Sequence, residues 1–461
     1  MINALKSKHP IFNILLTNKA VLSIAFNALG KGVYFLFILL VGRLITADSK
    51  TDVYFFTVEF IKVVVGYSLL INSDVLIPQI IKLKETSPEK LERLMGFFYA
   101  LYVVLGIAST VLILLFPQFF LGIFSKFTEA IISKDYSIFS FLMPILFFNI
   151  LSGLQSSILI AYNYFVTPSL VIFLGNCLSL TILFFLYQQL GINAAILGII
   201  VGGISINIIL AYYLKVKCHI RYTLNFKIDF SIFKSINYVT LVYVTASICN
   251  FVLIYLLTAS EETTTTAYNY ASLISFIPHQ FIGVQLITIM ANKFAELYNT
   301  QQFDLLKAYI KRTLIGLTIL ILPFCIVYVF FSPTIVNIIS GGDLNSENYR
   351  HKFSLLLRYF AFPAFFNSIF LCGLRLYTTT LRIRTPSIVQ SIINLTLVVS
   401  NYIGFRYFNI EGLGVSVLLV YGLMFLSGIY LIVNFFKIID KQQSDMDQEN
   451  TLGTLSLENA V

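Results

Sequence analysis

Long apolar stretches separated by short polar segments recur along almost the whole chain. A helix needs roughly 20 apolar residues to cross about 30 Å of hydrocarbon. Twelve stretches reach that length, near residues 20–45, 53–81, 94–116, 137–161, 168–189, 194–214, 236–258, 267–291, 308–332, 353–380, 386–406 and 411–436. The pattern predicts an all-α, polytopic integral membrane protein with about 12 transmembrane helices. An even number of spans places both termini on one side.

Lysine and arginine divide unevenly between the two sides that these spans create. If the N-terminus is cytoplasmic, the cytoplasmic segments hold 20 of the 31 basic residues, and the opposite loops hold seven. Basic residues accumulate in the cytoplasmic loops of membrane proteins. We therefore predict that both termini are cytoplasmic.

The chain contains an internal repeat. The segment "TPSLVIFLGNCLSL" begins at Thr167, and "TPSIVQSIINLTLV" begins at Thr385, 218 residues later; at the same offset Asn176 matches Asn394. Duplicated bundles of this kind are typical of transporters. We predict two pseudo-symmetric six-helix lobes with a polar tail, in this order: an N-terminal lobe 1–214, a basic cytoplasmic linker 215–235, a C-terminal lobe 236–436, and a disordered cytoplasmic tail 437–461.

Composition and charge agree with a membrane protein. The chain is 58% hydrophobic and 11% charged, with a mean hydropathy of +0.85, whereas soluble domains carry roughly 25% charged residues. The net charge of +9 would suggest a nucleic-acid partner in a soluble protein. Here the basic loops account for the charge, so no nucleic-acid partner is predicted.

Motifs that carry enzyme chemistry are missing from the sequence. There is no G-x-x-x-x-G-K-[ST] and no G-x-S-x-G, the four histidines lie far apart, and the five cysteines lack metal-site spacing,. We therefore expect a protein that is not an enzyme, with no catalytic residue, no metal and no bound cofactor.

Charged residues inside membrane spans are costly and usually mark function. Six lie inside the predicted spans and away from the terminal residues of those spans, namely Lys31, Glu59, Lys62, Asp74, Arg358 and Arg375, while Asp52 opens the second span and His279 lies within the eighth. Glu59 and Lys62 are three residues apart, so they share a helix face and can pair. Asp74 lies near the cytoplasmic end of its span, and both arginines are close enough to the ends of theirs to snorkel.

Lys31 has no acidic residue within its own span. Gly30 and Gly32 flank it, which allows another backbone or a ligand to approach closely. Two interpretations stay open. Lys31 either pairs with Glu59 across the first two spans, or faces an aqueous cleft and attracts an anion.

Several segments, in their order and spacing, resemble one transporter family. "TDVYFF" (51–56) opens the second span and is followed by "LIPQI" (76–80), and "YNYASLISFIPHQFIGVQLITIMANKFAEL" (268–297) forms the eighth. These segments resemble the MurJ/MviN branch of the multidrug/oligosaccharidyl-lipid/polysaccharide (MOP) flippase superfamily. The resemblance covers nearly the whole chain.

The resemblance implies a V-shaped, two-lobed bundle with a cationic cleft that holds a pyrophosphate. Lys31 falls at the position of one family arginine in the first span, and Asp52 matches the family's aspartate. The other family arginines fall at Phe37, Val65 and Leu273 in this chain. The candidate substrate-binding cations are Lys31 and Lys62, the candidate cleft or coupling acids are Asp52 and Glu59, and Arg375 and Asp74 are further candidates.

The expected function is to flip a polyprenyl-pyrophosphate-linked saccharide from the inner to the outer leaflet of the bacterial cytoplasmic membrane by alternating access. The expected partners are this substrate and membrane lipids, and the sequence does not identify a protein partner. A proton or sodium gradient or the membrane potential would drive transport. The substrate is lipid II-like or, alternatively, an O-antigen or exopolysaccharide unit. A multidrug or cation antiporter and a non-transporting membrane enzyme are two further candidate functions.

Overall fold

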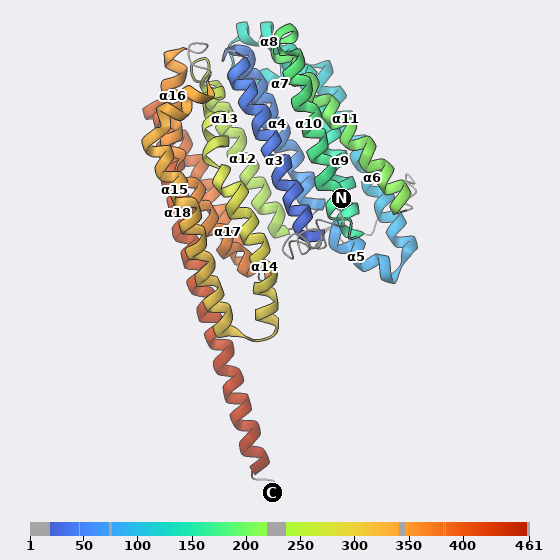
Figure 1. Ribbon diagram of the computed structural model, residues 1–461, viewed down its shortest axis with the longest axis vertical. Coiled ribbons are helices and arrows are strands. Elements are labelled where there is room, and N and C mark those ends of the chain that lie inside the picture. The colour runs from blue at the N-terminus through green and yellow to red at the C-terminus, as the bar shows by residue number, and fades with distance from the viewer. Residues whose placement is uncertain are drawn as a thin grey trace, which may run out of the picture. The chain divides into compact units, whose positions relative to one another are not determined.

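The computed structural model describes residues 19–45, 47–72, 76–218, 237–340, 346–380, 382 and 384–458. Helices make up nearly all of these residues, and no strand occurs among them (Figure 1). The all-α prediction is therefore confirmed. Asp74 and most of the predicted linker 215–235 lie outside the described residues.

The helices group into two compact units by their internal contacts, one made of Met1–Asn269 with Thr334–Lys352 and the other of Tyr270–Pro333 with Phe353–Val461. The division into six-helix lobes at 214 and 236 stays a prediction. In chain order the helices are α3 (Lys19–Leu44), α4 (Ser49–Ile71), α5 (Ile77–Thr86), α6 (Pro88–Leu115), α7 (Pro117–Phe124), α8 (Glu129–Leu142), α9 (Pro144–Ala161), α10 (Val166–Leu190), α11 (Ile192–Lys217), α12 (Asn237–Thr258), α13 (Thr264–Ser275), the π-helix η3 (His279–Gly283), α14 (Val284–Asn299), α15 (Phe303–Ile339), α16 (Glu347–Phe360), α17 (Pro363–Thr379) and α18 (Arg384–Glu458).

Nine stretches of helix among the described residues are long and apolar enough to cross a membrane. Each of the twelve predicted spans overlaps observed helix within its described residues. The counts of nine observed stretches and twelve predicted spans differ for two reasons. Helix α18 carries two predicted spans, and α4 and the segment α13–η3–α14 each carry one predicted span but are not among the nine stretches. The chain is therefore a multi-pass membrane protein.

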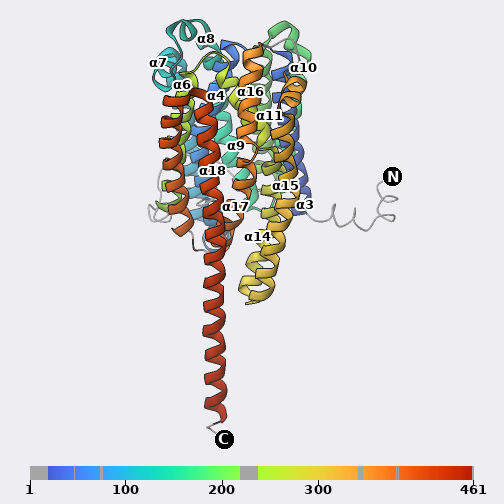
Figure 2. The ribbon, with the colours of Figure 1, turned by 90° about the vertical axis from the view of Figure 1, so that its left-hand side faces the viewer.

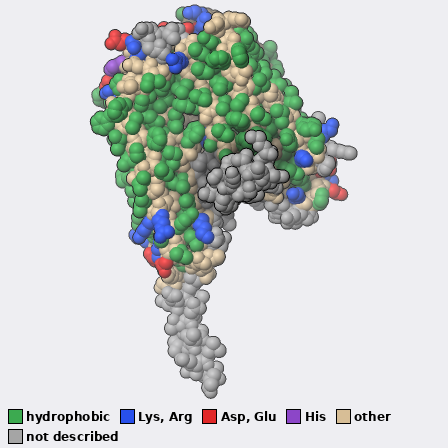
Figure 3. All heavy atoms as spheres, in the orientation of Figure 1, with side chains coloured by type: hydrophobic (Ala, Val, Ile, Leu, Met, Phe, Trp, Pro, Cys, Tyr) green, Lys and Arg blue, Asp and Glu red, His purple; other side chains and the backbone are tan. Residues whose placement is uncertain are grey.

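Apolar side chains cover the outside of the bundle, as expected for a surface in contact with lipid. Figure 3 shows hydrophobic side chains over most of the visible face, with Lys, Arg, Asp and Glu gathered toward the ends. Phe185 on α10 and Phe330 on α15 are 71% and 73% exposed. Large exposed apolar surfaces are rare in soluble monomers, so this surface supports a membrane environment.

Two single-residue turns have the same backbone conformation at the predicted repeat offset. Gly191 joins α10 to α11 with φ 54° and ψ −129°, and Asn409 joins the two halves of α18 with φ 49° and ψ −131°. The two positions are 218 residues apart. Glycine adopts positive φ without steric cost, and Asn is one of the few other residues that tolerate it. The shared turn geometry supports an internal duplication.

The C-terminal end of α18 differs from the predicted disordered tail. Ile439 is fully buried, Asp440 forms an ion pair with Lys307 of α15, and Gln442 accepts a hydrogen bond from Tyr298 of α14 at 3.1 Å. These contacts hold the start of the segment 437–461 as helix, although its acidic, polar composition predicted disorder. Helix α18 continues to Glu458 (Figure 2).

Candidate functional site

A cavity of about 230 Å³ lies inside the first unit among α3, α4, α8, α9, α10 and α11. Aliphatic and aromatic side chains form much of its wall. Five polar side chains also line it: Tyr34, Lys62, Asn149, Asn176 and Ser179. A mostly apolar pocket with a few converging polar groups is the usual form of a small-ligand site.

Lys62 supplies the positive charge of this cavity. Its Nζ atom lies 2.6 Å from Oε1 of Glu59, one turn earlier on α4, so the predicted pair is confirmed. An ammonium group donates three hydrogen bonds, and Glu59 accepts one of them. The Lys62 side chain is 51% exposed. The side chain therefore remains accessible in the cavity while its ammonium group pairs with Glu59.

Lys31 lies half-buried on α3, one of the helices around the cavity, but it is not among the residues that line the cavity. Its neighbour Gly30 packs against the backbone of Phe173 on α10, where an added Cβ would lie 3.5 Å from the Phe173 Cα. The amide of Asn176, which lines the cavity, donates to the Gly30 carbonyl at 3.0 Å. That distance is an ordinary van der Waals contact, so the approach of α10 does not depend on glycine at position 30. The orientation of Lys31 toward a cleft or toward Glu59 stays a prediction.

Asp52 does not line the cavity but caps a helix. Its carboxylate is 3% exposed and accepts hydrogen bonds from the Thr263 amide at 2.6 Å, the Thr266 amide at 2.9 Å and the Thr266 hydroxyl at 2.6 Å. Thr266 lies in the first turn of α13, and Thr263 is the residue just before that helix. A carboxylate there satisfies amides without helical partners and interacts favourably with the helix dipole. These hydrogen bonds connect the start of α4 to the start of α13, so the observed role of Asp52 is structural.

Further charged residues of the first unit form contacts between segments that are distant in the sequence. None of these residues is a candidate site residue in the sequence analysis. Ser49 donates its hydroxyl to Asp135 and its amide to Glu262, both at 2.7 Å. Lys352 pairs with Glu261 at 2.8 Å. The hydrogen bond from Lys352, with a second one from Asn348, lowers the pKa of the Glu261 carboxyl. Residues far apart in sequence make these contacts, so spacing alone gives no signal for them.

The two arginines of the predicted tenth span belong to the second unit. Arg358 on α16 donates from Nε to the hydroxyl of Ser332 at 2.8 Å. Arg375 on α17 is exposed. Neither residue lines the cavity of the first unit.

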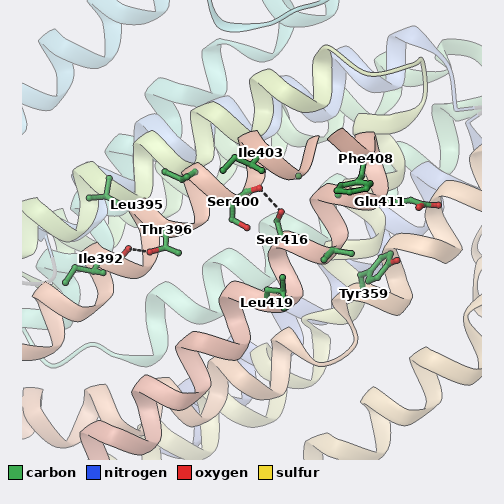
Figure 4. A pocket seen from close by; sticks show the side chains of 14 residues that line it. Tyr359, Ile392, Leu395, Thr396, Ser400, Ile403, Phe408, Glu411, Ser416 and Leu419 are labelled. Carbon is green, nitrogen blue, oxygen red and sulfur yellow. Dashed lines mark hydrogen bonds between the residues drawn. The ribbon is translucent and has the colours of Figure 1, made fainter. Parts of the chain in front are cut away.

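The second unit has a larger cavity of different chemistry, about 870 Å³ in volume (Figure 4). It lies between the two halves of α18, which the hydrogen bond from the Ser416 hydroxyl to the Ser400 carbonyl connects at 2.7 Å. Its wall consists mostly of apolar side chains, such as Leu395, Val399 and Ile403. The charged residue in its lining is Glu411. This lining suits hydrocarbon chains and does not suit an anion.

A duplicated helical membrane protein with a polar, cation-bearing cavity in its first unit has the construction of a transporter. The family described as "Lipid II flippase MurJ" matches residues 44–460. The chain therefore belongs to the MurJ lipid II flippase family, which confirms the predicted resemblance.

Solved structures of the same superfamily share this fold. The chain is similar to "Lipid II flippase MurJ, inward closed conformation", with 17% identity, a TM-score of 0.73 and coverage of 91% of this chain and 89% of that one. It is similar to an inward-facing multidrug resistance MATE family transporter of the MOP superfamily, with 14% identity, a TM-score of 0.73 and coverage of 91% and 96%. A comparison with curated protein sequences gave no match.

A third similar structure is a MOP superfamily transporter from Pyrococcus furiosus, described by the phrase "reverse polarity of binding pocket suggests different function". Its identity is 16%, its TM-score is 0.65, and the similarity covers 90% of this chain and 96% of that one. At these identities the structures establish the fold, and the family match establishes the branch of the superfamily.

Proposed function

We propose that this protein flips a polyprenyl-pyrophosphate-linked saccharide from the inner to the outer leaflet of the bacterial cytoplasmic membrane by alternating access. The observation that carries the proposal is the Lys62 ammonium in the polar cavity of a chain that belongs to the MurJ lipid II flippase family. A pyrophosphate needs positive charge in a site surrounded by hydrocarbon. A multidrug or cation antiporter would favour an acidic cavity.

Lys62 is suited to bind and release an anion repeatedly. Glu59 accepts one of its three N–H donors, which leaves two that can donate to phosphate oxygens,. Hydrogen bonds between charged groups are roughly twice as strong as neutral ones. When the anion leaves, Glu59 at 2.6 Å still neutralises the ammonium. Lys31 on the neighbouring α3 is proposed as the second cation of the site.

The glycan is proposed to be lipid II-like, with an O-antigen or exopolysaccharide unit as the second candidate. One observation favours the second candidate. The other family arginines fall at Phe37, Val65 and Leu273 in this chain, and Phe37 itself lines the cavity and is 1% exposed. The chain therefore has fewer cations at these positions than the family pattern implies.

Both termini are proposed to be cytoplasmic, with transport driven by the membrane potential or by a proton or sodium gradient. At about 2.3 kcal/mol per charge per 100 mV, the potential is a substantial force on an anionic headgroup.

Purified protein in liposomes tests the proposal directly. Fluorescent lipid II and a fluorescent undecaprenyl-pyrophosphate-linked O-antigen unit would be placed in separate vesicle preparations. Loss of fluorescence to a membrane-impermeant quencher reports the fraction in the outer leaflet. We expect flipping of at least one substrate above the rate of empty liposomes. Background rates for both substrates would contradict the proposal.

A further inference from the structure

A buried histidine in the second unit lies on an irregular segment of helix. His279 is 4% exposed and begins the π-helix η3, directly after Pro278. The Val284 amide closes the wide turn by donating to the His279 carbonyl. A Cβ on Gly283 would lie 2.6 Å from the Ser368 hydroxyl and 3.3 Å from His279 Nδ1. Gly283 thus leaves room for the imidazole ring beside α17.

Both ring nitrogens of His279 contact neighbouring residues of α17. Nδ1 lies 2.8 Å from the Ser368 hydroxyl, and Nε2 lies 2.9 Å from the Asn367 amide nitrogen. The Ser368 hydroxyl donates to the Ala364 carbonyl at 2.9 Å, so it accepts from Nδ1–H. The Asn367 amide donates to Nε2. This pattern fits a neutral imidazole with its proton on Nδ1.

The same two partners can also satisfy the protonated ring. In the imidazolium both nitrogens are donors, so Nε2–H needs an acceptor in place of the Asn367 N–H. Rotating the Asn367 amide by half a turn presents its oxygen to Nε2. The Ser368 contact is unchanged. The two states differ by one proton and one amide orientation.

Ionisable residues buried in membrane spans are expensive and mark proton or ion pathways by default. π-helical turns also occur often at functional sites. Histidine is the side chain whose charge changes most readily near neutral pH. His279 lies on the irregular segment between α13 and α14.

We propose that His279 is a proton-binding site, held by Asn367 and Ser368, through which this transporter uses a proton gradient. The inference rests on the proposed function, since it names the source of energy for it. Binding a proton on one side of the membrane and releasing it on the other would favour one conformation of the α13–η3–α14 segment over another.

The surroundings of His279 combine apolar contacts with a few titratable groups. The Phe276 ring packs edge-on against the imidazole with centroids 6.0 Å apart, and Tyr421 of α18 packs against Phe276. Ile321 of α15 faces Gly283. The titratable groups on the packed elements include Tyr421 on α18, Cys325 on α15, Cys372 and Arg375 on α17, and Lys293 on α14.

Nitrogen NMR of the full chain in lipid nanodiscs tests whether His279 titrates. The chain has four histidines, so ¹⁵N-histidine labelling gives few signals, and His279→Gln assigns the one in question. We expect the Nδ1–H neutral form at high pH and the imidazolium at lower pH, between about pH 8 and about pH 5. A signal that stays neutral throughout that range would overturn the proposal.

Variants of Asn367 test whether its contact with Nε2 determines the pH at which His279 titrates. Asn367→Asp places a negative charge beside Nε2 and should move the midpoint to higher pH by about one unit or more. Asn367→Leu removes the acceptor and should move it to lower pH. Asn434→Asp adds the same charge elsewhere in the second unit and is the matched control. Equal midpoints in Asn367→Asp and the wild type would overturn the proposal.

Transport assays in proteoliposomes test whether the flipping rate depends on the proton gradient. With fluorescent lipid II as the probe, a gradient of one pH unit should change the wild-type rate by up to about tenfold. His279→Gln should flip at a rate that does not respond to the gradient, and its melting temperature should match the wild type. A wild-type rate unaffected by the gradient would overturn proton coupling and leave the flippase function standing. Absence of flipping under all conditions, with both lipid II and the lipid-linked O-antigen unit, would instead contradict the proposed function.

Discussion

At the scale of single residues, two acidic side chains of α4 differ in where their partners lie, because Glu59 pairs within its own helix and Asp52 bonds to the start of α13. The Glu59–Lys62 pair follows from a spacing of three on one helix, and the structure confirms it at 2.6 Å. The Asp52 contacts could not be predicted, because Thr263 and Thr266 are more than 200 positions away along the chain. Only the folded bundle brings the start of α13 beside α4.

The Lys62 ammonium is the group whose removal should affect flipping most directly. Lys62→Met keeps most of the length of the side chain and removes its charge. A hydrogen bond to a charged group contributes about 1.5–3 kcal/mol, so we expect about a tenfold to hundredfold lower flipping rate in proteoliposomes. Lys311→Met, on the exposed surface of α15, is the control and should keep the wild-type rate. A Lys62→Met variant that flips normally would exclude Lys62 from the site.

At the scale of elements, hydrophobic runs predicted the positions of the helices because the bilayer fixes their length. The runs did not reveal the breaks inside the helices. Pro144 and Pro363 each begin a new helix within a predicted span, and η3 interrupts the eighth span. The end of α18 was predicted wrongly from its composition. The start of this segment is helical because Asp440 and Gln442 contact α15 and α14, and composition does not encode those contacts.

The paired turns at Gly191 and Asn409 give an element-scale prediction. Both residues have positive φ in a region that favours glycine, and a non-glycine residue there carries strain of about 1–3 kcal/mol. Asn409→Gly should raise the free energy of unfolding by about 0.5–1 kcal/mol, after the entropy of glycine is subtracted. Gly191→Ala should lower it by about 1–2 kcal/mol. Thermal unfolding in detergent measures both, and a change of the opposite sign in either variant would contradict the shared turn geometry.

At the scale of the whole molecule, the pH dependence of stability includes a contribution from Glu261. The pKa of Glu261 is lowered from 4.5 in the folded protein by hydrogen bonds from Lys352 and Asn348. A lowered pKa means that the stabilisation is fully present above the ordinary value and is lost as the pH falls through the folded value. The side chain is 76% exposed, so solvent screening keeps the effect small.

Comparing the wild type with Glu261→Gln isolates this contribution. At about pH 7 the variant should have the lower melting temperature, because it lacks the carboxylate that Lys352 contacts,. The two melting temperatures should converge as the pH falls below 4.5, since the wild-type carboxylate becomes neutral. A difference that stays constant between about pH 7 and about pH 3 would show that the ion pair contributes nothing. Glu129→Gln, at the start of α8, is the control for loss of a surface carboxylate.

The proposed orientation of the whole chain rests on its basic loops, which favour cytoplasmic termini by 20 basic residues to seven,. Ser346, just before α16, should then face outward, and Ser444, on the exposed C-terminal part of α18, should face the cytoplasm. A membrane-impermeant maleimide should label Ser346→Cys in intact cells and label Ser444→Cys only after lysis. The wild type, with its five cysteines, gives the background. The reverse labelling would invert the orientation and, with it, the leaflet from which the proposed site loads its substrate.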